Sequence, residues 1–166
     1  MIYTTPYSSP IGMLTLGSDG TALVGLWIEG QKYFLWKYTE TLNNDKLEIF
    51  TKTKHWLDEY FKGNNPQITL PLAPRGTEFQ QKVWKELEKI PYGKTVTYGD
   101  IAKKLGTRGI QAVGSAVGRN PVSIIIPCHR VVGRDGTLTG YAGGIDKKLI
   151  LLQLENPLYN NPVSQF

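Results

Sequence analysis

The stretch Ile124-Ile125-Ile126-Pro127-Cys128-His129-Arg130 joins three β-branched residues to a cysteine, a histidine and an arginine. β-Branched residues favour extended chain, and a short, uncharged apolar run is typical of a buried strand, so we expect residues 124–126 to form one. That strand would place Cys128 at its end, and reactive residues often lie at the ends of strands. A free cysteine is also commonly an inert core residue, so both interpretations of Cys128 stay open at this point.

A reactive Cys128 needs a base, because the thiolate and not the thiol is the nucleophile. The adjacent His129 is the candidate, since the only other histidine, His55, is expected at the surface or edge of a helix. Neighbouring side chains of extended chain point apart, so either Pro127 bends the chain or a water bridges the sulfur and the imidazole. The imidazole in turn needs a carboxylate that sets its tautomer.

Glu155 is the candidate carboxylate. It ends a predicted apolar helix, Asp146–Glu155, for which Asp146 would be the cap. A carboxylate in such apolar surroundings favours a specific partner, although a solvated glutamate at a helix end is the other interpretation.

Upstream of the cysteine the pattern is helical. Thr77 and Gln80 form a capping box before a helix that ends ahead of Pro91, and its apolar face comprises Phe79, Val83, Leu87 and Ile90. Thr97, with Asp100 three residues later, caps a second helix that Gly106 ends, and a third is predicted over Ile110–Val117. Two short helices around Gly106–Gly109 match a helix-turn-helix, although paired helices without DNA contacts fit the pattern as well.

The first third of the chain predicts a small antiparallel sheet. Its strands are Met1–Thr5, Met13–Ser18 and Ala22–Ile28, the last two joined by the hairpin signal Asp19-Gly20. An amphipathic helix follows at Lys46–Lys62, and the proline-rich segment Gly63–Pro74 is typical of a linker. We therefore expect a mixed α/β fold of the α+β kind, with a small β-rich domain with one helix and its linker at 1–74 and a mainly helical domain at 75–166.

Composition limits the possible functions. Of the 166 residues, 40% are hydrophobic and 20% charged, which is ordinary for a globular protein. One cysteine excludes an internal disulfide, and two histidines make a metal site improbable, so no metal is expected. The net charge of +5 favours a polyanionic partner but equally fits simple solubility. Neither a membrane span nor a secretory signal is evident, so we expect a cytoplasmic protein with no membrane partner.

Three further motifs accompany the cysteine. They are Asn120-Pro121 before it, the glycine-rich loop Thr139-Gly140-Tyr141-Ala142-Gly143-Gly144, and Lys148 with Leu151-Leu152-Gln153-Leu154-Glu155. Together with Ile126-Pro127-Cys128-His129-Arg130-Val131 they resemble the O6-alkylguanine-DNA alkyltransferases over about Thr77–Glu155. The part before Pro74 resembles the smaller domain of that family only loosely.

The resemblance implies a single-use DNA repair reaction, without a cofactor, in which Cys128 accepts the alkyl group of O6-alkylguanine. His129 would act as base through water, Glu155 would orient His129, and Asn120 would organise the active-site turn. Tyr98 would stack near the target base and donate a proton to the departing guanine. The pocket would be lined by Tyr98, Val131, Tyr141, Ala142 and the carbonyls near Cys128 and Val131. O4-alkylthymine is a second expected substrate.

The resemblance also implies that the third helix lies in the minor groove of double-stranded DNA, with the damaged base flipped out, and that the protein acts as a monomer. Small residues would let this helix approach the groove floor: Ala112, Gly114, Ser115, Ala116 and Gly118. Arg119 would contact phosphate. Many relatives fill the gap left by the flipped base with an arginine, where this chain has Gln111, and Arg108 is close enough to substitute. The zinc ligands of some relatives are absent.

Two other classes of protein compete with this interpretation. A regulatory or lesion-binding DNA module without transfer activity would fit the helix-turn-helix, but relatives of that kind lack the cysteine. A cysteine hydrolase using Cys128, His129 and Glu155 would turn over repeatedly, but the sequence shows no convincing oxyanion hole.

Overall fold

The structure is a computed structural model that describes residues 1–35 and 38–160. Its backbone contacts divide the chain into two compact units. The first unit comprises Met1–Arg75 and Pro121–Ser123, and the second comprises Gly76–Asn120 and the chain from Ile124 onward. Pro121–Ser123 were expected in the C-terminal domain. They belong to the first unit because Leu26 donates its N–H to the Pro121 carbonyl (2.8 Å) and accepts from the N–H of Ser123 (3.1 Å).

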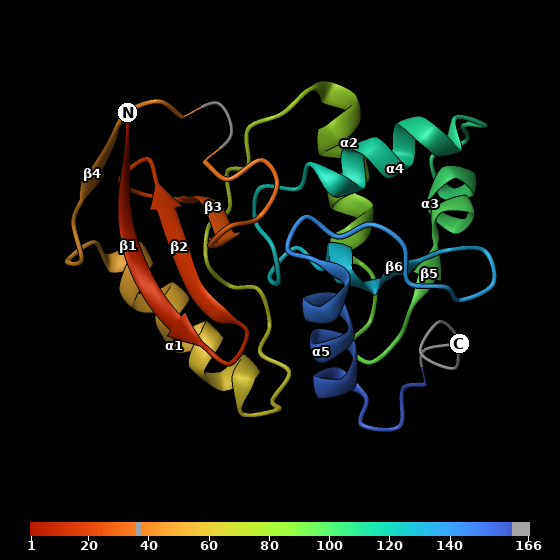
Figure 1. Ribbon diagram of the computed structural model, residues 1–166. Coiled ribbons are helices and arrows are strands. Elements are labelled where there is room, and N and C mark those ends of the chain that lie inside the picture. The colour runs from red at the N-terminus through yellow and green to blue at the C-terminus, as the bar shows by residue number, and fades with distance from the viewer. Residues whose placement is uncertain (36–37, 161–166) are drawn as a thin grey trace. The chain divides into compact units, whose positions relative to one another are not determined.

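The first unit is a four-stranded sheet covered on one face by a helix (Figure 1). The strand order is β3-β2-β1-β4, antiparallel except that β4 runs parallel to β1. The elements are β1 (Ile2–Ser9), β2 (Gly12–Ser18), β3 (Leu23–Ile28), β4 (Thr41–Asn43) and α1 (Glu48–Phe61). The short β4 was not predicted, because all three of its residues are exposed and show no apolar alternation.

The second unit is mainly helical. Its helices are α2 (Glu78–Glu88), α3 (Tyr98–Lys104), α4 (Ile110–Gly118) and α5 (Ile145–Glu155), with a 3-10 turn at Cys128–Arg130 and a two-stranded parallel sheet of β5 (Val96–Thr97) and β6 (Val131–Val132). Both capping boxes are present, Thr77 with Gln80 and Thr97 with Asp100. The helix α2 packs on α4, where the Trp84 indole donates to the Ala116 carbonyl (2.8 Å). The expected fold class is confirmed.

Two local predictions were wrong. Residues Ile124–Ile126 form a buried turn and no strand, and Ile124 has a φ of 74°. The left-handed conformation is unfavourable for a β-branched residue, so the surrounding contacts must stabilise it. Gly144 and not Asp146 is the N-cap residue of α5; it has a φ of 103°, and Asp146 lies in the first turn.

No helix in residues 1–35 and 38–160 is long and apolar enough to cross a membrane.

Candidate active site

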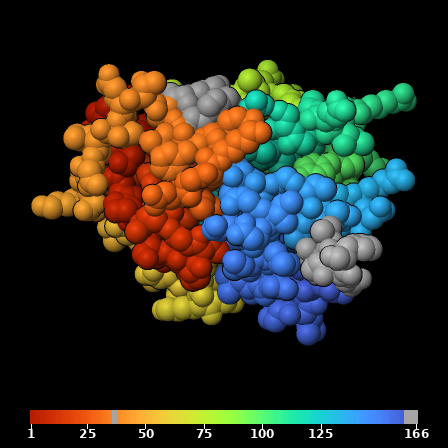
Figure 2. Space-filling model, in the orientation of Figure 1, coloured from red at the N-terminus to blue at the C-terminus, as the bar shows by residue number. Residues whose placement is uncertain are grey.

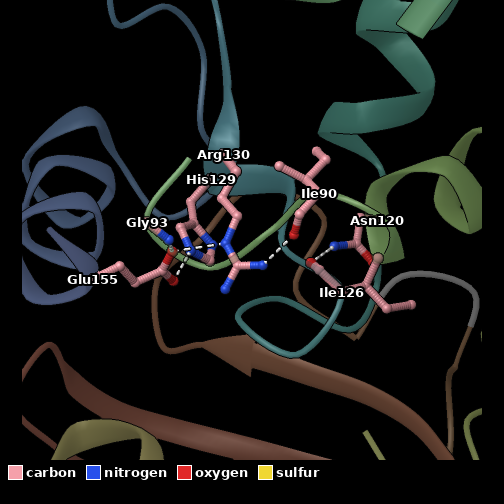
Figure 3. A network of polar contacts seen from close by, with 7 residues as sticks. All are labelled: Ile90, Gly93, Asn120, Ile126, His129, Arg130 and Glu155. Atoms are coloured by element: carbon pink, nitrogen blue, oxygen red, sulfur yellow. Dashed lines mark hydrogen bonds and ion pairs between the residues drawn. The ribbon is translucent and has the colours of Figure 1, made fainter. Parts of the chain in front are cut away.

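Cys128 lies at the end of a tight turn in the second unit. Pro127, with φ −82° and ψ 65°, is the central residue of an inverse γ-turn in which the Cys128 N–H donates to the Ile126 carbonyl (2.8 Å). The buried Asn120 side chain donates to the same carbonyl (2.7 Å; Figure 3). The chain therefore bends at Pro127, but in the described residues the bend does not give His129 Nδ1 a hydrogen-bond partner, so the bridging water expected from the sequence is still needed to connect the sulfur and the imidazole. Cys128 is only 5% exposed.

The two residues after Cys128 both contact one carboxylate. Nε2 of His129 lies 2.5 Å from Oε2 of Glu155, and Nε of Arg130 donates to Oε1 of the same residue (2.7 Å; Figure 3). The Glu155 side chain is 1% exposed and that of His129 fully buried. Arg130 also donates to the Ile90 carbonyl (2.7 Å) and lies over the ring of Tyr92. Glu155 is thus a paired, buried carboxylate and not a solvated one.

These contacts determine the proton positions. Burial alone would raise the pKa of Glu155. The combined effect of His129 and Arg130 is larger and opposite, and it lowers this pKa from 4.5 to about 2. Burial, assisted by the cations Arg130 and Lys148, holds the pKa of His129 below its usual value despite Glu155. A neutral His129 therefore donates its Nε2–H to Glu155, and its Nδ1 carries the free lone pair. In the described part of the chain, this buried Nδ1 has no hydrogen-bond partner.

Cys128 is a protonated thiol at neutral pH. Burial raises its pKa, and the opposing influences of Asn120 and Lys148 are smaller. Becoming a nucleophile therefore requires a group that takes the proton during the reaction.

Tyr98 is held close to this turn by the β5–β6 pairing, in which Val96 lies opposite Val131 and Thr97 opposite Val132. Tyr98 follows β5 directly, and the turn precedes β6. The Tyr98 hydroxyl donates to the Thr139 carbonyl (3.1 Å), and burial raises its pKa. A Cβ added at Gly114 of α4 would lie 3.8 Å from the Tyr98 ring, so the two are in van der Waals range.

The other residues expected to line the pocket lie close by in the chain. Val131 is buried in β6, and Tyr141 and Ala142 are half-buried in the loop before α5. Figure 2 shows the blue surface of the segment after β6 beside the green and teal surface of α3 and α4, in agreement with the Tyr98–Thr139 bond.

Two basic residues were not assigned a contact from the sequence. Arg130 was part of the motif but was not expected to share Glu155 with His129. Lys148 on α5 is fully buried, and its Nζ donates to the carbonyls of Thr139 (3.0 Å) and Gly140 (3.4 Å). The sequence signal that could have identified the Lys148 contacts is the presence of a lysine within a largely apolar helix.

The residues expected to contact DNA form a stripe that begins at Arg108, just before α4, and ends at Arg119, the C-cap residue of α4. Val113, Ala116 and Val117 face the interior of the second unit. Arg108, Gln111, Ala112 and Ser115 are exposed, the last three at helical spacing on α4, and Arg119 donates from its guanidinium to the Ser115 hydroxyl (2.6 Å). Residues 76–166 hold twelve of the nineteen lysines and arginines but seven of the fourteen acidic residues, so they account for the whole net charge of +5.

Among the residues that the structure describes, no group of three or more His, Cys, Asp or Glu side chains could hold a metal ion.

Comparisons with known proteins agree in both halves of the chain. Residues 2–74 match the family model "6-O-methylguanine DNA methyltransferase, ribonuclease-like domain", and residues 78–157 match its "DNA binding domain". Methylated-DNA–protein-cysteine methyltransferases of Haemophilus influenzae (42% identical, 95% of this chain and 88% of that protein) and Mycobacterium bovis (45%, 93% of each) are similar. The crystal structure of Mycobacterium tuberculosis OGT in complex with DNA superposes with a TM-score of 0.86 at 42% identity, covering 93% of both chains.

Proposed function

The chain belongs to the family of 6-O-methylguanine DNA methyltransferases, and on that premise we propose that it repairs DNA by moving the alkyl group of O6-alkylguanine onto Cys128. The observation that carries the proposal is the position of its only cysteine, immediately before the buried His129–Glu155 pair. A single thiol next to a histidine with a free Nδ1 is an arrangement suited to one-step nucleophilic attack. No cofactor enters this reaction.

The reaction is a displacement at the alkyl carbon. The bond from Sγ to that carbon forms as the bond from the carbon to O6 breaks, and the electron pair of the broken bond stays on guanine. The thiol proton passes to His129, and guanine receives a proton in return, so the net change replaces the alkyl group on guanine by hydrogen. Because a thioether is not readily cleaved, each protein molecule reacts once.

His129 is the base in this scheme. Its Nδ1 is the nitrogen able to accept the thiol proton, and a bridging water is the proposed carrier between Sγ and Nδ1. Glu155 fixes the tautomer through Nε2 and stabilises the imidazolium that forms. Asn120 acts through the backbone: by donating to the Ile126 carbonyl it maintains the turn that presents Cys128.

Tyr98 supplies the proton to the departing guanine; the phenolate then regains a proton from solvent, to which the His129 imidazolium releases the proton taken from the thiol. Protonation makes guanine a better leaving group, which lowers the barrier to displacement. Tyr98, the first residue of α3, is the proposed pocket residue whose phenol donates this proton. Tyr141, Ala142 and Val131 would complete a pocket for the flat base. The same pocket and the same attack at an alkyl carbon extend the proposal to O4-alkylthymine.

Double-stranded DNA is the partner. The target carbon lies within the duplex, so the base must be flipped into the pocket at a cost of a few kcal/mol. The stripe on and beside α4, which comprises Arg108, Gln111, Ala112, Ser115 and Arg119, would face the minor groove, and the positive charge of residues 76–166 favours phosphate contacts. Residues 75–166 would thus be the alkyl-acceptor and DNA-binding domain and residues 1–74 the smaller domain. The protein would act as a monomer in the cytoplasm.

Intact-mass measurement after incubation with an O6-methylguanine duplex tests the proposal. We expect one methylene to be added, on the peptide that contains Cys128, in a stoichiometric amount. Cys128→Ser should bind undamaged DNA as the wild type does but gain no mass, because the thiol supplies reactivity and not affinity. Repeated turnover, or methylation of the Cys128→Ser variant at the wild-type rate, would rule out the assignment.

A further inference from the structure

Arg130 is a buried cation whose guanidinium is held on three sides. Its Nε donates to Oε1 of Glu155 (2.7 Å), and its Nη1 donates to the Ile90 carbonyl (2.7 Å). The guanidinium also lies over the ring of Tyr92, with 5.6 Å between its central carbon and the ring centroid. Figure 3 shows the guanidinium between the carboxylate on one side and the Ile90 carbonyl on the other. Because a guanidinium stays charged throughout the neutral pH range, Arg130 is a fixed and permanent positive charge.

The carboxylate that Arg130 contacts also contacts the proposed base. Oε2 of Glu155 lies 2.5 Å from Nε2 of His129, so the two oxygens of one carboxylate face two different partners. The carboxylate has one negative charge, and Arg130 balances it. With a neutral His129, these three side chains therefore have no net charge. The imidazole and the carboxylate are 0% and 1% exposed, so water screens little of any excess charge at this place.

Removal of the arginine charge would change this balance. A buried carboxylate without a cation is unfavourable, so a charged partner or a proton is then stabilised beside it. His129 is the adjacent titratable group, and a proton on its imidazole would restore a net charge of zero. An imidazolium has no lone pair at Nδ1, so it could not accept the proton of the Cys128 thiol.

Other charged groups also surround His129. The charged and titratable groups near it are Arg130 and Cys128 in its own turn, Lys148 and Glu155 on α5, Tyr92 before β5, and, on α2, Glu86 in an ion pair with Lys89 (2.9 Å). Glu155 favours the imidazolium, whereas burial, Arg130 and Lys148 disfavour it. Of the two cations, Arg130 is the one in direct contact with the carboxylate that His129 shares.

We propose that Arg130 is a positioning residue that balances the charge of Glu155 and so keeps His129 neutral in the resting protein, with Nδ1 able to accept the thiol proton. This inference rests on the proposed function, since it assumes that His129 is the base of the reaction. The role is electrostatic and acts through Glu155. A residue that only held the turn in shape would not change the titration of His129.

The protonation of His129 can be measured directly, because the chain contains only two histidines. Nuclear magnetic resonance of the imidazole nitrogens reports both, and His55, which is exposed on α1, is the internal reference. Arg130→Gln keeps hydrogen-bonding groups but removes the charge, so His129 should become protonated at a higher pH than in the wild type. Arg130→Lys retains the charge and should lie closer to the wild type. The matched control is Arg134→Gln, at an exposed arginine of the same segment, and it should leave the titration unchanged.

The rate of alkyl transfer should follow the same titration. Free O6-benzylguanine is the substrate, because it needs no base flipping, and single-turnover rates are measured at about pH 6 and about pH 8. In Arg130→Gln the protonated fraction of His129 is larger at the lower pH. The rate there should therefore fall about tenfold or more beyond the fall at the higher pH. Arg130→Lys should recover most of the lost rate, and Arg134→Gln should match the wild type at both pH values.

Three results would overturn the inference and leave Arg130 a residue that only holds the turn. They are an unchanged His129 titration in Arg130→Gln, an equal fall in its rate at both pH values, and an equally displaced titration in Arg130→Lys. If Arg130→Gln lacks the circular dichroism spectrum of the wild type, Arg130→Met is measured in the same way. A wild-type His129 that is already protonated at neutral pH would overturn the inference without any variant. A protein that shows the expected titrations but gains no alkyl group would instead refute the proposed function.

Discussion

Glu155 accepts hydrogen bonds from His129 and from Arg130, so two adjacent residues of one turn depend on a single carboxylate. We predict that Glu155→Gln slows alkyl transfer at least tenfold, because the imidazolium formed at His129 loses the negative charge that stabilises it. The measurement is a single-turnover rate with an O6-methylguanine duplex. An unchanged rate would show that Glu155 has only a structural role.

The same substitution should change stability in a pH-dependent way. The pKa of Glu155 is lowered in the folded protein from 4.5 to about 2, so its contribution is complete above about pH 4.5 and is lost as the pH falls toward 2. The difference corresponds to roughly 3 kcal/mol of unfolding free energy. Urea unfolding should show Glu155→Gln less stable than the wild type at pH 7 and the gap reduced at pH 3. Glu78→Gln, at a carboxylate that is 89% exposed, should change stability by less than about 0.5 kcal/mol at either pH.

At the scale of the secondary-structure element, Gln111 on the exposed face of α4 stands where the resemblance to the alkyltransferases predicts an arginine. If its amide occupies the space of the flipped base, it can hydrogen-bond the orphaned base and hold the extrahelical state by about 1–3 kcal/mol. Gln111→Ala should then slow repair of duplex DNA roughly ten- to a hundredfold. Reaction with free O6-benzylguanine, which needs no flipping, should keep its rate.

Paired single-turnover measurements on duplex and free base test this prediction, with Gln153→Ala on the exposed side of α5 as a matched control. Gln111→Arg should raise duplex affinity and make it more sensitive to salt, because it adds a cation near phosphate. If Gln111→Ala slows both substrates equally, Gln111 supports the fold of α4. The exposed Arg108 would then be the candidate for the flipping role.

For the whole molecule, the uneven charge distribution predicts a modest dependence of DNA binding on salt. The stripe contains the cations Arg108 and Arg119, and Lys103 and Lys104 lie in the last turn of α3, shortly before it in the chain. Four phosphate contacts would give a slope of about −4 in a plot of log association constant against log salt concentration. Fluorescence anisotropy with undamaged duplex measures it.

Charge removal identifies the surface involved. Arg108→Gln should make the slope about 0.9 shallower, whereas Lys46→Gln, at an exposed lysine of the first unit, should leave it unchanged. Binding that does not depend on salt would contradict a footprint dominated by phosphate contacts.

Much of the fold was predictable from the sequence where the signals are local. The capping boxes at Thr77 and Thr97 act within one helical turn, and the strands β2 and β3 follow from apolar runs joined by Asp19-Gly20. The Pro-Cys-His-Arg motif with its distant companions was sufficient to predict the family. These features need only residues that are close in the chain or a pattern shared with relatives.

What the tertiary structure decided depends on groups that are far apart in the sequence. The apolar run at residues 124–126 predicted a strand, but the fold bends it into a turn with Ile124 at positive φ, stabilised in part by the Asn120 bond to Ile126. The sharing of Glu155 by His129 and Arg130, and of the Thr139 carbonyl by Tyr98 and Lys148, joins residues 9 to 41 positions apart. Neither apolar periodicity nor helix propensity encodes such contacts. The contacts form only when packed elements exclude water, because a buried polar group then needs a partner within the protein.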